Sequence, residues 1–276
     1  MRKVSSFGKT IMNTALLIFS LSAVFPIVWM LYSSFKTQQE FTLNIFALPK
    51  NWNLENYIEA FKIGQLHNYF FNSVYVSLIS VFLIIFLAFI IGYMIARHDF
   101  PGRRIIYILF LFGMLIPIHG LLVPIFIEFK NVGLLNKPYT LILPYVAFGL
   151  PIAIFLFESF IKQIPKEIEE AAIMDGCNTF QVIFRVIFPI AGPVIATATI
   201  LSFLTAWNEF PFALVLIQDP ALRTLPVGLT NFNGQYTVNY PQMMAAMSVT
   251  VLPVLLVYLA FSKKIIQGMT AGAVKG

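Results

Sequence analysis

Four of the twelve acidic side chains of this largely apolar chain gather in residues 164–189, where their charge could take part in binding or catalysis. They are Glu167, Glu169, Glu170 and Asp175. Three of them stand where the positive end of a helix dipole would stabilise negative charge. Helices that rest in a lipid interface usually carry Lys and Arg on their polar face, which is the opposite sign. We therefore expect a docking element for a protein partner, with an interfacial helix as the alternative.

Other chemistry-bearing patterns fail on their spacing. The single cysteine, Cys177, excludes an intrachain disulfide, and His67, His98 and His119 do not cluster as metal ligands. Residues 8–10, Gly-Lys-Thr, lack the first glycine of a phosphate-binding loop and a preceding strand. No nucleophile, acid and base fall within reach of one another. We expect neither an enzyme nor a metal site nor a cofactor bound by this chain.

The composition indicates an integral membrane protein. Hydrophobic residues make up 59% of the 276, and charged residues 11%, against about 25% in soluble domains. Apolar runs of about the 20 residues that cross a bilayer predict six helical spans, at residues 11–32, 72–96, 105–127, 139–161, 186–208 and 242–262. The fold expected is all-α and multi-pass.

The basic residues set the expected orientation. Twelve of the 18 Lys and Arg residues lie in the segments that six spans place on one side, against six on the other. The side richer in Lys and Arg is the inner one, so both termini are expected in the cytoplasm. Because the basic residues flank apolar spans rather than gather on one soluble face, we expect no nucleic-acid partner.

The acidic stretch itself predicts a helix, a glycine turn and a second helix. Pro165 suits a first helical position, where its missing N–H has no intrahelical partner. Gly176 can adopt the left-handed conformation that ends a helix. Asn178 or Thr179 can then cap the next helix.

The third predicted span is interrupted. Pro117, His119, Gly120 and Pro124 all fall inside it. Such breaks are tolerated at membrane depth only where neighbours, water or a cavity satisfy the freed backbone groups. His119 is therefore expected either to line a path or to serve as a hydrogen-bonded histidine at the helix break.

The fifth predicted span becomes polar towards its end. Its middle is small and hydroxylated, up to Thr205, which favours close helix packing and offers polar groups to an aqueous path. Asn208 and Glu209 follow, just before Pro211. We expect Thr205, Asn208 and Glu209 at the external mouth of a pathway.

The acidic stretch also resembles a known motif. Glu170-Ala171-Ala172, then Gly176, then an Ile-Phe-Pro ending at 187–189 are similar to the cytoplasmic EAA loop of membrane subunits of ATP-binding-cassette importers. The resemblance implies a type I importer permease fold, with a coupling-helix hairpin at 164–186 between spans four and five. It assigns the contact with an ATPase subunit to Glu170, Ala171, Ala172, Asp175 and Gly176.

Two further segments resemble the carbohydrate branch of that family. The segment Trp207 to Phe210 is similar to a signature of sugar-importer permeases, and the tail 268–276 to their terminal motif. By that resemblance Gly272, Ala273 and Lys275 face the ATPases. A loop of the maltose-type importer that reaches into the docked binding protein corresponds here to Asn231, Asn233, Gly234, Gln235 and Tyr236.

The resemblance implies a permease subunit of an ATP-driven, binding-protein-dependent oligosaccharide importer in a bacterial or archaeal plasma (inner) membrane. Its partners would be a second permease in a heterodimer, two ATPase subunits holding ATP and Mg, an extracytoplasmic solute-binding protein and the bilayer. A permease for glycerol phosphate esters is an alternative within the family. A self-powered secondary transporter is the other, but such pumps usually carry carboxylates at membrane depth, and none lies centrally in these spans.

Overall fold

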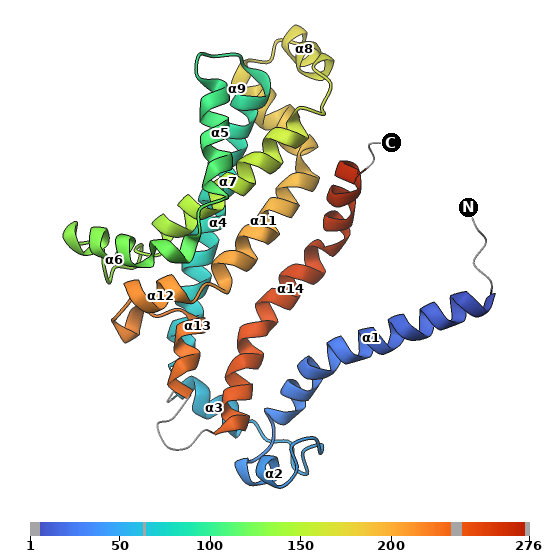
Figure 1. Ribbon diagram of the computed structural model, residues 1–276, viewed down its shortest axis with the longest axis vertical. Coiled ribbons are helices and arrows are strands. Elements are labelled where there is room, and N and C mark those ends of the chain that lie inside the picture. The colour runs from blue at the N-terminus through green and yellow to red at the C-terminus, as the bar shows by residue number, and fades with distance from the viewer. Residues whose placement is uncertain (1–5, 63–64, 233–238, 274–276) are drawn as a thin grey trace. The chain divides into compact units, whose positions relative to one another are not determined.

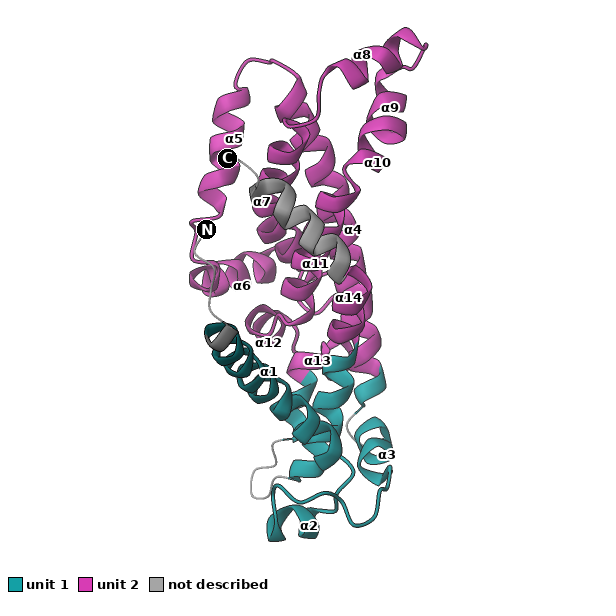
Figure 2. Ribbon diagram, turned by 90° about the vertical axis from the view of Figure 1, so that its right-hand side faces the viewer, with its two compact units in different colours: residues 1–67, 228–252 teal, residues 68–227, 253–276 magenta. Residues whose placement is uncertain are grey.

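The computed structural model describes residues 6–62, 65–232 and 239–273, with side chains described in 8–62, 65–232 and 239–261. Within these ranges every regular element is a helix and no strand occurs, which confirms the all-α prediction. The chain divides into two compact units, residues 1–67 with 228–252 and residues 68–227 with 253–276 (Figures 1 and 2).

The first unit contains a buried lysine. Its elements are α1 (Ser6–Ser33), α2 (Gln38–Leu43), α3 (Glu55–Lys62), η4 (Leu229–Phe232) and the first part of α14 (Tyr240–Ala273). The amine of Lys36, which is 1% exposed, donates to the carbonyl oxygens of Asn44 and Ile45, at 3.3 and 2.8 Å. The Asn56 amide donates to the carbonyl oxygens of Ser34 and Lys36 at 2.7 and 2.8 Å. These hydrogen bonds compensate the buried amine and the buried carbonyl groups for the water contacts that they lose on folding.

The second unit is a bundle in which α5 and α11 both pack against α7 (Figure 1). Its helices are α4 (Leu66–Arg97), α5 (Arg103–Gly113), η1 (Ile118–Leu121), α6 (Leu122–Asn131), α7 (Ile142–Ile161), α8 (Glu167–Met174), α9 (Thr179–Gln181), η2 (Val182–Ile187), α10 (Phe188–Ile190), α11 (Gly192–Trp207), α12 (Pro211–Leu216), η3 (Pro220–Leu222) and α13 (Leu225–Gly228).

Close approach of α4 to α7 forms the centre of this bundle. Phe89 and Phe157 are buried and meet edge to face with ring centroids 5.5 Å apart. Gly92 lies beside them, and a Cβ added there would come within 2.8 Å of the Phe157 Cβ. The missing side chain lets the two backbones approach, as small residues do where helices pack in a membrane.

Four helical segments are long and apolar enough to cross a membrane: Gly8–Ser33, Leu66–Arg97, Ile142–Ile161 and Tyr240–Phe261. Two further pairs reach that length and composition only together. Arg103–Gly113 and Ile118–Asn131 meet at 91°, and Thr179–Ile190 and Gly192–Trp207 meet at 77°. The first bend falls at the predicted interruption of the third span. The described residues thus contain four candidate spans that are single helices, or six if each bent pair is one span.

Candidate functional site

The predicted helix, glycine turn and second helix are present and form a hairpin, residues 164–190, at one end of the second unit (Figure 1). Its first helix, α8, begins at Glu167, so Pro165 lies two residues before the helix rather than at its first position as predicted. Gly176 has φ +88°, which confirms the predicted left-handed conformation. No atom lies within 4 Å of the position that its Cβ would take. Asn178 caps α9, and Gln181 completes the capping box by bonding back to the Asn178 N–H at 2.9 Å.

The inner face of the hairpin is packed into the chain's own core. Ala172 is 8% exposed and belongs to the same buried cluster as Val182 and Ile187 of the second arm. Of the residues expected to contact an ATPase, Ala172 therefore faces inward. Glu170, Ala171, Asp175 and Gly176 are exposed, in keeping with that expectation.

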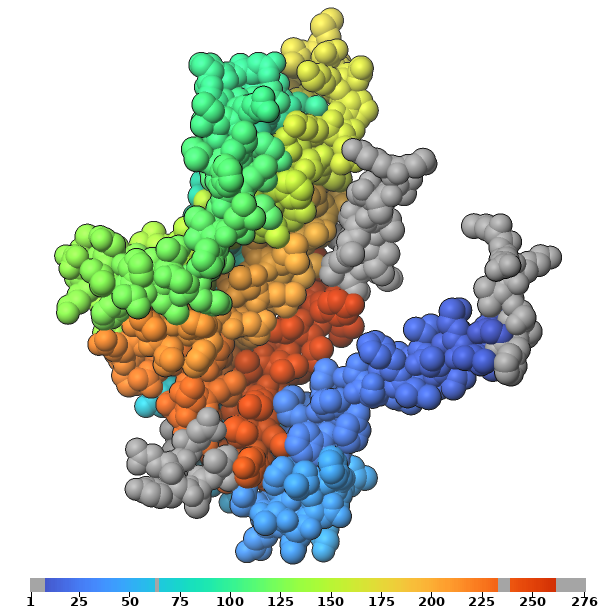
Figure 3. Space-filling model, in the orientation of Figure 1, coloured from blue at the N-terminus to red at the C-terminus, as the bar shows by residue number. Residues whose placement is uncertain are grey.

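The outer face carries large apolar side chains that the motif did not single out. Met174 is 87% exposed, Phe180 68% and Ile173 58%. We call these three residues the hairpin tip; α8, in yellow, stands out at the end of the second unit in Figure 3. The sequence could have indicated these residues by their position. Ile173 and Met174 fall on the outward face of the predicted amphipathic helix, where polar residues are expected.

The hairpin is fastened to the end of α4 by a buried ion pair. Arg97 Nε donates to Glu169 Oε1 at 2.5 Å, and the Tyr93 hydroxyl donates to Glu169 Oε2 at 2.8 Å. Arg97 Nη2 also donates to the carbonyl oxygen of Ile164 at 2.7 Å, just before α8. The side chains of Arg97 and Glu169 are only 6% and 12% exposed. Arg97, Tyr93 and Glu169, which we call the clamp, were not found from sequence, which pointed instead to the exposed Glu170.

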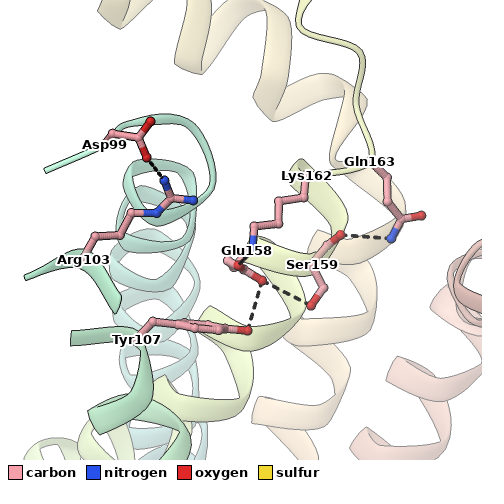
Figure 4. A network of polar contacts seen from close by, with 7 residues as sticks. All are labelled: Asp99, Arg103, Tyr107, Glu158, Ser159, Lys162 and Gln163. Carbon is pink, nitrogen blue, oxygen red and sulfur yellow. Dashed lines mark hydrogen bonds and ion pairs between the residues drawn. The ribbon is translucent and has the colours of Figure 1, made fainter. Parts of the chain in front are cut away.

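A second polar network joins α5 to α7 near the same end (Figure 4). Glu158, 2% exposed, accepts a hydrogen bond from the Tyr107 hydroxyl at 3.0 Å and pairs with Lys162 one helical turn away. Arg103 pairs with Asp99 in the loop before α5. Lys162, just after α7, therefore balances the charge of the buried Glu158 carboxylate, and Tyr107 of α5 adds a hydrogen bond to it.

A cavity of about 270 Å³ lies within the second unit, where α11 ends against η1, α7 and α12. Most of its wall is apolar, and five lining residues carry polar side chains: His119, Tyr145, Ser202, Thr205 and Glu209. The remaining lining residues are Ile84, Ile118, Phe148, Gly149, Ile152, Leu201, Ala206 and Phe212. The fold thus brings His119 of η1 beside Thr205 and Glu209, three residues expected on a pathway.

Glu209 is held rigidly in this wall. Its carboxylate accepts from the backbone N–H groups of Phe212 and Ala213 at 2.7 and 3.0 Å, which caps the start of α12. The Tyr145 hydroxyl donates to Glu209 Oε2 at 2.6 Å. Asn208, expected beside it, does not line the cavity, because its amide turns back to the Leu204 carbonyl oxygen at 2.9 Å.

The remaining predicted site residues fall at the edge of the description. Asn231 is exposed in η4, whereas Asn233, Gly234, Gln235 and Tyr236 lie outside the described residues. In the tail, Gly272 and Ala273 end α14 with side chains outside the description, and Lys275 lies outside it altogether. Over the described part of the chain, His, Cys, Asp and Glu form no group of three that could hold a metal.

Several apolar helices that are long enough to cross a membrane place the chain among multi-pass membrane proteins. The family follows from sequence: residues 84–270 match the binding-protein-dependent transport system inner membrane component, and the chain belongs to that family. This membership confirms the resemblance to importer permeases and assigns the chain to a membrane subunit rather than an enzyme.

The relatives share most of their length with this chain. A sulfoquinovosyl glycerol transport system permease protein of Agrobacterium fabrum is 37% identical, over 99% of this chain and 97% of its own. A diacetylchitobiose uptake system permease protein of Streptomyces coelicolor is 38% identical, over 95% and 87%. An arabinooligosaccharides transport system permease protein of Bacillus subtilis is 33% identical, over 93% and 92%.

Solved structures show the same fold. A chain of a bacterial ABC transporter involved in the import of the acidic polysaccharide alginate superposes with a TM-score of 0.82, at 24% identity, over 96% of this chain and all of its own. A chain of the bacterial alginate ABC transporter in complex with an alginate pentasaccharide-bound periplasmic protein gives 0.65, at 16% identity, over 94% and 95%.

Proposed function

We propose that this chain is one permease subunit of an ATP-driven, binding-protein-dependent importer of a sugar or oligosaccharide. Family membership and relatives that serve glycoside and oligosaccharide uptake support the class. The chain forms half of the translocation pathway together with a second permease. ATP and Mg are bound by two ATPase subunits, and an extracytoplasmic binding protein delivers the substrate.

The observation that carries the proposal is the hairpin tip. Met174, Phe180 and Ile173 are large apolar side chains exposed on a short helical hairpin that also exposes Glu170 and Asp175. An apolar helix face that is exposed on its own chain is suited to a groove on a partner. The ATPase subunit supplies that groove on the cytoplasmic side, and its closure on ATP moves the hairpin.

The rest of the chain is assigned by the same reasoning. The candidate span Gly8–Ser33 has no buried residue in its most apolar stretch, so lipid and the second permease are its surroundings. Both termini face the cytoplasm, where Gly272, Ala273 and Lys275 contact the ATPases. The loop from Asn231 to Tyr236 faces outward, towards the binding protein.

The test is co-purification with an ATPase partner after one change at the tip. Met174→Asp places a charge in the docking surface and should lower ATPase recovery at least tenfold, because a desolvated charge at a hot spot removes several kcal/mol of binding. Glu170→Lys should weaken the association as well. Leu43→Asp is the matched control, because Leu43 is 84% exposed at the end of a helix remote in sequence.

Three results would contradict the proposal. ATPase recovery with Met174→Asp equal to that of the wild type would remove the tip from the contact. Labelling of the native thiol at Cys177 from outside intact cells would put the hairpin on the wrong side of the membrane. Uptake by this chain alone in proteoliposomes, driven by an ion gradient, would support the self-powered alternative instead.

A further inference from the structure

We propose that the pocket at the start of α5 binds the head of an anionic phospholipid, with an acyl chain of that lipid lying along α5. The inference rests on the proposed function, because that function places the hairpin end of this unit at the inner leaflet, which holds the anionic lipids. It is carried by the charges that line the pocket and by the exposed apolar side chains that continue from it.

The pocket lies between the start of α5 and the end of α7. Its volume is about 560 Å³, within the range of roughly 300–1,000 Å³ that is typical of small-molecule sites. Figure 4 shows Arg103 of α5 and Lys162, just after α7, on opposite sides of this space. The charged residues that line it are Asp99, Arg103, Arg104, Glu158 and Lys162.

The pocket holds one cation more than its carboxylates can balance. Arg103 pairs with Asp99, and Lys162 pairs with Glu158. Arg104 is exposed and forms no ion pair with any described residue. Three basic residues against two carboxylates leave a net charge of +1 in the lining. A single phosphodiester would neutralise it, and an arginine fork binds phosphate oxygens in a bidentate manner.

The start of α5 favours an anion at the same place. Gly102, the residue before the helix, lines the pocket and makes no side-chain cap. The first N–H groups of a helix carry its positive partial charge and readily bind phosphate oxygens. Since α5 begins at Arg103, its positive end and the unpaired Arg104 lie together, and both attract a phosphate.

An exposed apolar side of α5 continues from the pocket. Ile105, which lines the pocket, is 65% exposed, and Leu109 and Phe112 are 64% and 58% exposed. Their spacing of four and then three residues puts them on one side of the helix. At 1.5 Å per residue they cover about 10 Å along the helix axis. A free phosphate would leave these side chains uncovered, whereas a phospholipid offers a phosphate and an apolar chain together.

The net charge selects the kind of phospholipid. Phosphatidylglycerol brings one negative charge, which the surplus cation of the pocket balances. Phosphatidylcholine carries the same phosphate with a quaternary ammonium, so the surplus charge would stay uncompensated. One basic residue near a lipid surface contributes about 1 kcal/mol, which corresponds to a preference of about fivefold for the anionic lipid.

The test is lipid binding to the membrane complex that co-purifies with this chain, titrated in detergent and counted by native mass spectrometry. Phosphatidylglycerol and phosphatidylcholine are the probes, and glycerophosphoglycerol, the deacylated head group, is the competitor. Arg104→Gln should weaken phosphatidylglycerol about fivefold and bring the two lipids within about twofold of each other, whereas Arg104→Lys should keep the preference. Because Arg104 is exposed, both variants should unfold at the temperature of the wild type.

Two further variants control for the fold and for charge in general. Asp99→Asn removes a carboxylate whose side chain is 94% exposed, so it should tighten phosphatidylglycerol binding, a gain that a misfolded chain would not show. Arg185→Gln is the matched control, because Arg185 is an exposed arginine of the hairpin that does not line the pocket. It should leave lipid binding within about twofold of the wild type.

The outcomes separate this inference from the proposed function. Equal affinity of the wild type for both lipids overturns the lipid site, and so do equal losses in Arg104→Gln and Arg185→Gln. Unchanged or weaker binding in Asp99→Asn also overturns it. Displacement of phosphatidylglycerol by equimolar glycerophosphoglycerol would identify a site for free phosphate esters instead. Absence of ATP-dependent uptake by the complete assembly, with selective lipid binding intact, would overturn the proposed function.

Discussion

Replacing Arg97 with Met should destabilise the chain by about 3–5 kcal/mol. The change removes the bonds of 2.5 Å to Glu169 and 2.7 Å to the Ile164 carbonyl oxygen. It leaves the Glu169 carboxylate, 12% exposed, with only the Tyr93 hydroxyl as a partner. Removing one partner of a buried ion pair typically costs about that much, because the other charge stays buried and uncompensated.

The double variant Arg97→Met, Glu169→Met separates the ion pair from its burial cost. Replacing both members of a buried pair by apolar residues of similar size is often neutral or stabilising. The double variant should therefore recover most of the free energy of unfolding that the single variant loses. Unfolding in mixed micelles with increasing SDS measures all variants, and the exposed Arg104→Met, expected within about 0.5 kcal/mol of the wild type, is the control.

The same pair should report on coupling between the hairpin and the spans. Arg97 joins the end of α4 both to α8 and to the segment before it, so a hairpin moved by an ATPase would carry α4 with it. We expect the double variant to be stable and to retain the ATPase, while substrate uptake per ATP hydrolysed falls at least tenfold.

Two results would refute this reasoning. A loss below about 1 kcal/mol in Arg97→Met would mean that the pair is solvated. Full coupling in the stable double variant would mean that apolar packing under the hairpin, rather than the clamp, carries the movement.

Three further substitutions test other positions of the chain. Gly176→Val should lower the free energy of unfolding by about 1–2 kcal/mol, because φ is +88° at this position, and should uncouple ATP hydrolysis from uptake. Gly176→Asn should be nearly neutral in both respects. If the two variants take up substrate equally well, the turn is not needed for coupling. Gly92→Ala should cost about 1–3 kcal/mol in SDS unfolding, since its Cβ would lie 2.8 Å from that of Phe157; Gly120→Ala, with no contact closer than 3.7 Å, should not, and equal stabilities would contradict the packing. Burial lowers the pKa of the Lys36 amine in the folded chain below its ordinary value of 10.5. At pH values between the folded and the unfolded pKa, the unfolded chain binds more protons, so the free energy of unfolding rises with pH. Lys36→Met should remove that rise, and an unchanged rise would mean that other groups cause it.

The sequence by itself determined whatever depends on neighbours along the chain. Composition and apolar runs established a membrane protein made of helices. Pro165, Gly176 and Asn178 determined a helix, a left-handed turn and a capped second helix, because capping and positive φ are properties of a few adjacent residues. The interruption of the third span was equally local, since proline removes a backbone donor wherever it stands.

Only the tertiary structure decided which polar groups meet. Glu169 and Glu170 are neighbours with the same local signal, yet one is buried against Arg97, 72 residues away, and the other is exposed. His119 and Glu209 line one cavity, although Asn208 beside Glu209 does not. In a chain with so few charges, burial and pairing are set by which helices pack together. The sequence located the break near Pro117, but it did not give the 91° angle there or the 77° bend between Ile190 and Gly192.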